Sequence, residues 1–251
     1  MNQSKDIDTM HGNEQAFDEI VHHRRSNRAF DPAIEIPDAV IEQALQHAIL
    51  SPNSSNMQLW EFHWIHSKEM LNAFVPLCLD QKAASTAKHL VVFITRQDLW
   101  KSRSKWNIAQ IQTTIQGEVT AIQKAGLNYY GKLMPFMYMR DPFGLMGMIR
   151  KTISFAMGLK GPFFRAGGAA QQRITVHKSC ALAAQTFMLS IASAGYHTCP
   201  MEGFDESRVK KMLKLPRRSE INMIIAIGQG TEKGVWGPRF RVPYDEVVRK
   251  Q

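Results

Sequence analysis

The stretch RRSNRAF at residues 24–30 places three arginines and a serine within five positions. Each arginine presents a planar fork of N–H donors that matches a phosphate or a carboxylate. The stretch follows a segment in which Phe17, Ile20 and Val21 have helical spacing. A basic cluster in a loop beside a helix end predicts an anion-binding site, and a solvated basic turn is the alternative.

Length and composition are those of a soluble globular protein. The chain has 251 residues, of which 44% are hydrophobic and 21% charged. We expect a short disordered tail over residues 1–14, which has no signal-peptide core, and a single domain over residues 15–251. No apolar run is long enough to span a bilayer. Three cysteines without a CxxC pair indicate neither a disulfide framework nor a zinc site, so a cytoplasmic location is expected.

The net charge of +9 is compatible with nucleic acid, an anionic membrane surface or an anionic cofactor. The basic residues are scattered, and no helix-turn-helix, zinc-finger or aromatic ribonucleoprotein motif is present. The sequence therefore argues against nucleic-acid binding as the main function.

Hydrophobic periodicity predicts alternating helices and strands. Apolar spacing predicts helices over residues 38–50, 68–79, 176–194 and 206–213, with a short helix ending near residue 88. Short apolar or alternating runs predict strands over residues 60–65, 89–95 and 221–227. Residues 51–60 and 200–204 are predicted to be a polar loop and a turn. Asp205 is placed to cap the helix that follows it.

Residues 100–172 are predicted to form a helical insertion rich in methionine and aromatic side chains. Methionine is flexible and suits adaptable binding surfaces, so we expect the part over residues 133–165 to be a substrate lid. The candidate lid residues are Phe136, Tyr138 and Phe143. A helical hairpin in the core or a dimer interface is one alternative, and a weak contact with a membrane surface is another.

Four stretches also share an order and a spacing. They are RRSNRAF at 24–30, SPNSSNMQLW at 51–60, PMEGF at 200–204 and GPRFRVP at 237–243. Together they resemble the FMN-dependent nitroreductase family, over nearly the whole chain except the tail and the insertion. The resemblance implies an α+β fold, with a central mixed, mainly antiparallel sheet flanked by helices, and a homodimer with two FMN sites at its interface.

The resemblance also assigns cofactor-binding residues. The phosphate and ribityl chain would be held by Arg24, Ser26, Arg28, Arg239 and Arg241, and Arg25 would lie at the pyrimidine side of the flavin. The turn that lies along the flavin ring would be Pro200, Met201, Glu202 and Gly203. Gln81 and Lys82 match a segment that often meets the flavin. The partner subunit would contribute Pro52, Asn53, Ser54, Ser55 and Asn56.

The implied activity is that of an oxidoreductase with a ping-pong mechanism. NADH or NADPH would be the electron donor, and a nitroaromatic, a quinone or an activated enone would be the acceptor. No side chain needs to act as a nucleophile, because the cofactor carries the chemistry. A reductive dehalogenase, a biosynthetic flavin dehydrogenase, and a flavin- or anion-binding protein without turnover are the alternatives. Leu59 and Asn53 stand where the family often has proline and serine.

Overall fold

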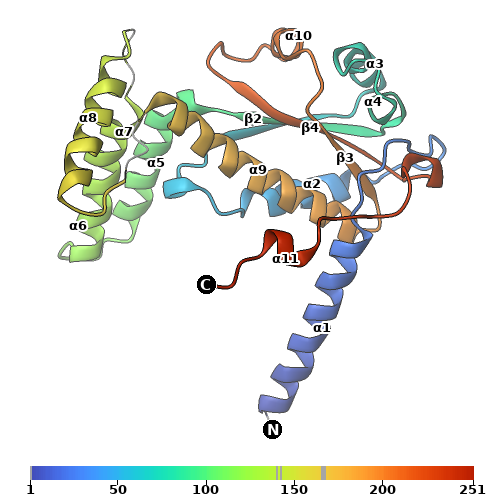
Figure 1. Cartoon of the computed structure of the whole chain (residues 1–251), viewed down its shortest axis with the longest axis horizontal. Helices are drawn as coiled ribbons and strands as arrows, with labels where there is room; N and C mark the ends of the chain where they lie inside the picture. Colours follow the sequence, from blue (N-terminus) through green and yellow to red (C-terminus); the bar gives the residue numbers. More distant parts are fainter. Residues whose placement is uncertain (1, 140, 142, 165–167) are drawn as a thin grey trace.

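Four strands form one sheet at the centre of the molecule (Figure 1). The computed structural model describes residues 2–139, 141, 143–164 and 168–251. The strands are β1 (Trp60–Ile65), β2 (His89–Thr95), β3 (His197–Met201) and β4 (Glu220–Gly228). They pair in the order β1-β2-β4-β3, and each named pair is antiparallel. The three strands predicted from the sequence are confirmed.

Strand β3 was not predicted. Pro200 and Met201, which we expected in a turn, are its last two residues. A proline is tolerated there because β3 is the edge strand of the sheet, where a missing N–H donor leaves no ladder bond unmade. The prediction of a turn is therefore wrong for these two residues, and the chain leaves the strand only at Glu202.

Helices cover both faces of the sheet, which gives three layers (Figure 1). One face carries α2 (Asp38–Ile49) and the second half of α9 (Ala169–Ser193), and these pack on Val91 and Phe93 of β2. The other face carries α3 (Lys68–Leu77), α4 (Lys82–Thr86) and α10 (Glu206–Met212), which lie over Leu90 and Val92. This alternation follows from the two-residue repeat of a strand that is buried on both faces. The predicted α+β fold is confirmed.

Helix α1 (Asn2–His23) extends away from the layered body (Figure 1). The tail that we expected to be disordered is thus helical from Asn2 onward. The segment contains no proline and a single glycine, Gly12, so the helix predicted before Arg24 can continue backward without a strong breaker. Its side chains over residues 12–19 are exposed.

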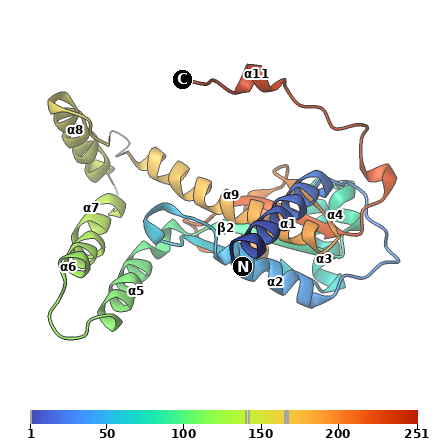
Figure 2. The same cartoon turned by 90° about the horizontal axis from the view of Figure 1, so that it is seen from below.

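The insertion forms a group of helices at one end of the molecule (Figures 1 and 2). Its helices are α5 (Trp100–Thr113), α6 (Ala121–Asn128), α7 (Met134–Tyr138) and α8 (Leu145–Lys160), with a π-helical turn, η3 (Tyr129–Leu133), between α6 and α7. Helix α9 begins seven residues before the predicted start at residue 176, so its first turns belong to this end of the molecule. No helix among the described residues has the length and apolarity needed to cross a membrane.

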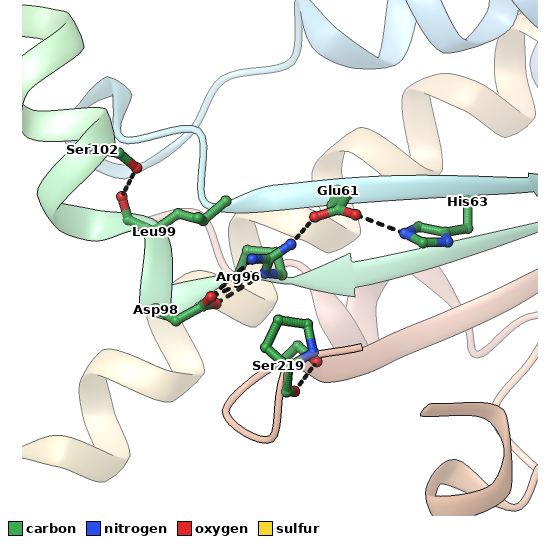
Figure 3. A network of polar contacts seen from close by, with 8 residues as sticks. Glu61, His63, Arg96, Asp98, Leu99, Ser102 and Ser219 are labelled. Carbon is green, nitrogen blue, oxygen red and sulfur yellow. Dashed lines mark hydrogen bonds and ion pairs between the residues drawn. The ribbon is translucent and has the colours of Figure 1, made fainter. Parts of the chain in front are cut away.

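A polar network fixes the point at which the insertion leaves the sheet (Figure 3). The Arg96 guanidinium pairs with Glu61 on β1 and donates to the carboxylate of Asp98, with its Nη2 2.9 Å from Asp98 Oδ2. Glu61 Oε1 lies 2.7 Å from His63 Nε2. Because Asp98 lies in the turn η2 (Gln97–Leu99) directly before α5, Arg96 joins the edge of the sheet to the start of the insertion.

Candidate functional site

The two basic motifs from opposite ends of the chain meet. Arg24, Arg25 and Arg28 line one surface cavity of about 290 Å³ together with Arg239 and Arg241. The remaining lining residues are Ser26, Trp236, Pro238 and Phe240. The arginines of RRSNRAF, for which the sequence predicts anion binding, therefore lie on the wall of a concavity that contains five arginines.

Buried Asn27 holds these two segments together. Its side chain is 2% exposed, donates from Nδ2 to Thr231 O at 2.9 Å and accepts from Ala29 N at 3.1 Å. Glycine is required beside it, since a Cβ added at Gly234 would lie 1.8 Å from Asn27 Oδ1. The backbone N–H of Arg28 then donates to Gly234 O at 2.8 Å, so the arginine loop is fixed on the segment that leads to Arg239.

The arginines are held by different contacts. Arg239 donates to Val21 O, His22 O and Arg24 O at 3.2, 2.8 and 2.7 Å, so it also satisfies the last carbonyls of α1. Arg25 Nη2 donates to Gly237 O at 2.9 Å. The Arg28 guanidinium lies over the Trp236 ring, 4.2 Å from its centroid. None of these roles was predicted, because each depends on a contact between distant parts of the chain.

The electrostatics of the cavity favour an anion. Burial, followed by the charges of Arg239, Arg241 and Arg25, lowers the pKa of Arg24. In the described part of the chain, no carboxylate lies within ion-pair distance of the five arginines. Clustered like charges without a counter-ion are relieved by a bound phosphate or carboxylate. The chemistry of these side chains therefore fits the phosphate of FMN.

A second group of predicted residues lies along β3. Gln81 Nε2 donates to Gly203 O at 2.6 Å, which joins the start of α4 to the turn that follows β3. The far end of α4 meets the arginine loop, because Phe30 N donates to Thr86 Oγ1 at 3.0 Å. Ser26 pairs with Thr198 of β3 in an isolated parallel bridge. Lys82 and Glu202 are exposed beside this group.

The loop that contains Pro52, Asn53, Ser54, Ser55 and Asn56 lies apart from the arginines. Ser54 N donates to Ser179 Oγ of α9 at 3.2 Å, whereas Ser26 lies next to β3, which follows the C-terminal end of that helix. The turns of α9 between Ser179 and Ser193 span about 20 Å. Figures 1 and 2 show the same separation. One protomer alone does not bring this loop to the arginine cavity.

This loop is instead held by the insertion. Ser55 Oγ lies 2.6 Å from Tyr129 Oη, and Tyr130 Oη donates to Ser55 O at 3.0 Å. Asn107 Nδ2 donates to Asn56 O at 3.0 Å. Ser55, Asn56 and Gln58 all have positive φ angles, of 56°, 47° and 48°. Such backbone is costly for side chains other than glycine and is maintained by surrounding contacts, here from α5 and η3.

The three predicted lid residues lie at different positions in the insertion. Phe136 and Tyr138 line an apolar cavity of about 470 Å³ between α7, α8 and the start of α9, and Ser54 and Ser55 lie on its wall. Tyr138 is buried, and its ring stacks on Trp100. Phe143 is 94% exposed and does not line the cavity. Arg150 and Gln172 also line the cavity, and neither could be selected from the sequence because both lie in stretches without a recognisable motif.

The chain matches a family model and several named proteins over most of its length. The Nitroreductase family model matches residues 21–229. MhqN of Bacillus subtilis, which carries the name of an NAD(P)H nitroreductase, is 23% identical over 232 residues, covering 92% of this chain and 97% of its own. The 4-nitrobenzoate reductase of Pseudomonas putida is 26% identical and covers 86% of each chain.

Solved structures show the same fold. A protein of Exiguobacterium sibiricum, which bears the name of a nitroreductase and was crystallised with FMN, superimposes with a TM-score of 0.70 at 20% identity, covering 94% of this chain and 97% of its own. The family model spans most of the chain and includes the arginine loop, the loop at residues 51–60 and β3. The chain therefore belongs to the nitroreductase family.

Proposed function

We propose that the protein is an FMN-dependent oxidoreductase that passes electrons from NADH or NADPH to a small organic acceptor. The observation that carries the proposal is the convergence of residues 24–28 with Arg239 and Arg241 in one cationic cavity. Family membership supports the same activity, as does the name of the relative MhqN.

The residues present have defined tasks toward FMN. Arg24, Arg28 and Arg241 are suited to the phosphate, because charge-assisted hydrogen bonds from guanidinium groups are strong and directional. Gln81 fixes the backbone at Gly203, and this contact supports the proposal that the turn lies along the flavin ring. The bound FMN supplies the transfer of hydride or electrons, and the protein contributes binding, orientation and exclusion of water.

The site is completed in a homodimer. The Ser54 loop cannot reach the arginines of its own protomer, but it is held in a strained conformation that the fold maintains at a cost. Exposed apolar side chains at the end of α2 and on α9 supply a surface for a second copy, among them Leu50, Ile174 and Leu182. Sedimentation of the protein at low micromolar concentration checks this, since a monomer that binds FMN tightly contradicts a shared site.

The insertion is proposed as the lid that selects the acceptor. It is attached to the Ser54 loop through Tyr129 and Tyr130, so a loop that enters the partner's flavin site carries the lid with it. Phe136→Ala should therefore change kcat/KM for bulky acceptors and leave FMN affinity unchanged. Phe143→Ala is the matched control, because Phe143 lies outside the cavity.

The acceptors proposed are nitroaromatics, quinones and activated enones. The name of the Pseudomonas putida relative supports a nitroaromatic acid among them. We expect the electron donor and the acceptor to bind in turn at the same face of the flavin. Such a ping-pong mechanism gives parallel lines in double-reciprocal plots.

Spectroscopy tests the proposed activity directly. The purified protein should be yellow, lose its colour when NADH or NADPH is added without oxygen, and regain it when the acceptor follows. A yellow protein that neither donor bleaches would instead be a flavin-binding protein without turnover. A protein that binds no flavin would refute the proposal.

A further inference from the structure

The apolar cavity of the insertion contains a buried hydrogen-bond donor without a partner. Gln172 is 5% exposed and lines the cavity. Its Oε1 accepts from Gln97 Nε2 at 3.4 Å, whereas its own Nε2 has no hydrogen-bond partner in the described part of the chain. A buried amide N–H without an acceptor is unfavourable, so this group is suited to receiving an oxygen atom from a ligand.

A buried cation lies in the same cavity. Arg150 is 2% exposed, and its Nη1 donates to Phe136 O at 2.9 Å and to Met139 O at 2.8 Å. These two carbonyl oxygens orient the guanidinium at the cavity wall. The residues that line the cavity include no carboxylate, and residues 142–201 of the sequence contain neither Asp nor Glu. Arg150 is therefore the charged residue of the lining, and Asp141, which directly precedes this range, accepts from the backbone N–H groups of Phe143, Leu145 and Met146.

Most of the remaining lining residues are apolar or aromatic, and Ser54, Ser55, Ser154 and Thr175 add hydroxyl groups. The cavity of about 470 Å³ falls within the usual range for small-molecule sites. Methionine and aromatic side chains make up most of its apolar lining, among them Met134, Met137, Phe163 and Phe164. An inorganic anion would lose its hydration on such a surface without compensation. An occupant that combines an apolar body with an anionic oxygen group would therefore suit both the apolar wall and the polar side chains.

We propose that this cavity binds an apolar carboxylic acid, with the carboxylate received by Gln172 and Arg150 and the apolar body by the aromatic and methionine side chains. This site is separate from the arginine cavity, with which it shares no residue. Together with the proposed function, on which this statement rests, the cavity would select acceptors that are aromatic or aliphatic carboxylic acids.

Calorimetric titration of the flavin-loaded protein tests the site with two probes. The probes are 2-naphthoate and the neutral 2-naphthalenemethanol, which has a similar shape. We expect 2-naphthoate to bind about tenfold more tightly, as for a hydrogen bond to a charged group. Gln172→Leu should reduce this preference severalfold. Gln171→Leu is the matched control, because this neighbour on α9 does not line the cavity.

A second variant tests whether lost binding comes from a blocked cavity and not from a change in the fold. Ile153 is partly exposed on the cavity wall, and Ile153→Trp should block both probes while thermal unfolding stays unchanged. Equal binding of the two probes to the unaltered protein, or an unchanged preference in Gln172→Leu, would overturn the proposal. FMN affinity is measured separately in each variant, so failure of this site and failure of the flavin site are distinguishable.

Discussion

Replacing Asn27 by alanine should weaken both the fold and the cofactor site, although Asn27 does not line the arginine cavity. The substitution removes the Asn27 Oδ1 acceptor of Ala29 N–H, which then stays buried and unpaired at a cost of about 1–3 kcal/mol. It also removes the donor to Thr231 O, worth about 0.5–1.5 kcal/mol because Gly234 N still donates to that oxygen. Together these losses should lower the free energy of unfolding by about 1.5–4.5 kcal/mol.

Urea denaturation followed by tryptophan fluorescence measures this change, with the slope checked for two-state behaviour. Asn72→Ala is the control, because Asn72 is exposed on α3 and its side chain makes no hydrogen bond in the described chain. Gly234→Ala should act like Asn27→Ala, since the added methyl group occupies the position of Asn27 Oδ1. If Asn27→Ala kept both the urea midpoint and the FMN affinity of the control, the reasoning about this junction would be refuted.

Two further changes are expected in stability. Asp205→Ala removes the N-cap bond to Arg208 N and should lower the free energy of unfolding by about 0.5–2 kcal/mol in the same urea assay; an unchanged midpoint contradicts the cap. Burial lowers the pKa of His63, His89 and His197 below the ordinary value of 6.5. Below pH 6.5 the unfolded chain then binds more protons than the folded chain, so the free energy of unfolding should fall as the pH drops from 7 toward 5. Thermal unfolding measures this change, and an unfolding temperature that stays constant across that range would contradict the lowered pKa values.

Local patterns in the sequence were sufficient for most elements of the fold. The run of β2 reports burial directly, because every side chain of this strand is buried between the two helical layers. The apolar spacing along α2 and α9 marks the one face of each helix that packs on the sheet. Asp205 caps α10 as predicted. Strand β3 could not be predicted because it forms by pairing with β4. Pro200, considered without that pairing, is typical of a turn.

The candidate site was predictable only as motifs. The sequence indicates that Arg24 and Arg241 bind an anion, but their meeting depends on the buried contact of Asn27 with Thr231 and Gly234. The cap that Arg239 forms on α1 and the position of Phe143 away from the cavity also depend on tertiary contacts. The spacing of residues along the sequence does not predict any of these tertiary contacts.

FMN titration of three arginine variants tests the cationic cavity most directly. Arg24→Ala and Arg241→Ala each remove a cavity arginine, whereas Arg217→Ala removes the same charge from an exposed site outside it. Losing one charge-assisted contact costs about 1.5–3 kcal/mol, so FMN affinity should fall roughly tenfold to a hundredfold in the first two variants and stay unchanged in the third. Equal affinities in all three variants and the unaltered protein would contradict the assignment of this cavity to the FMN phosphate.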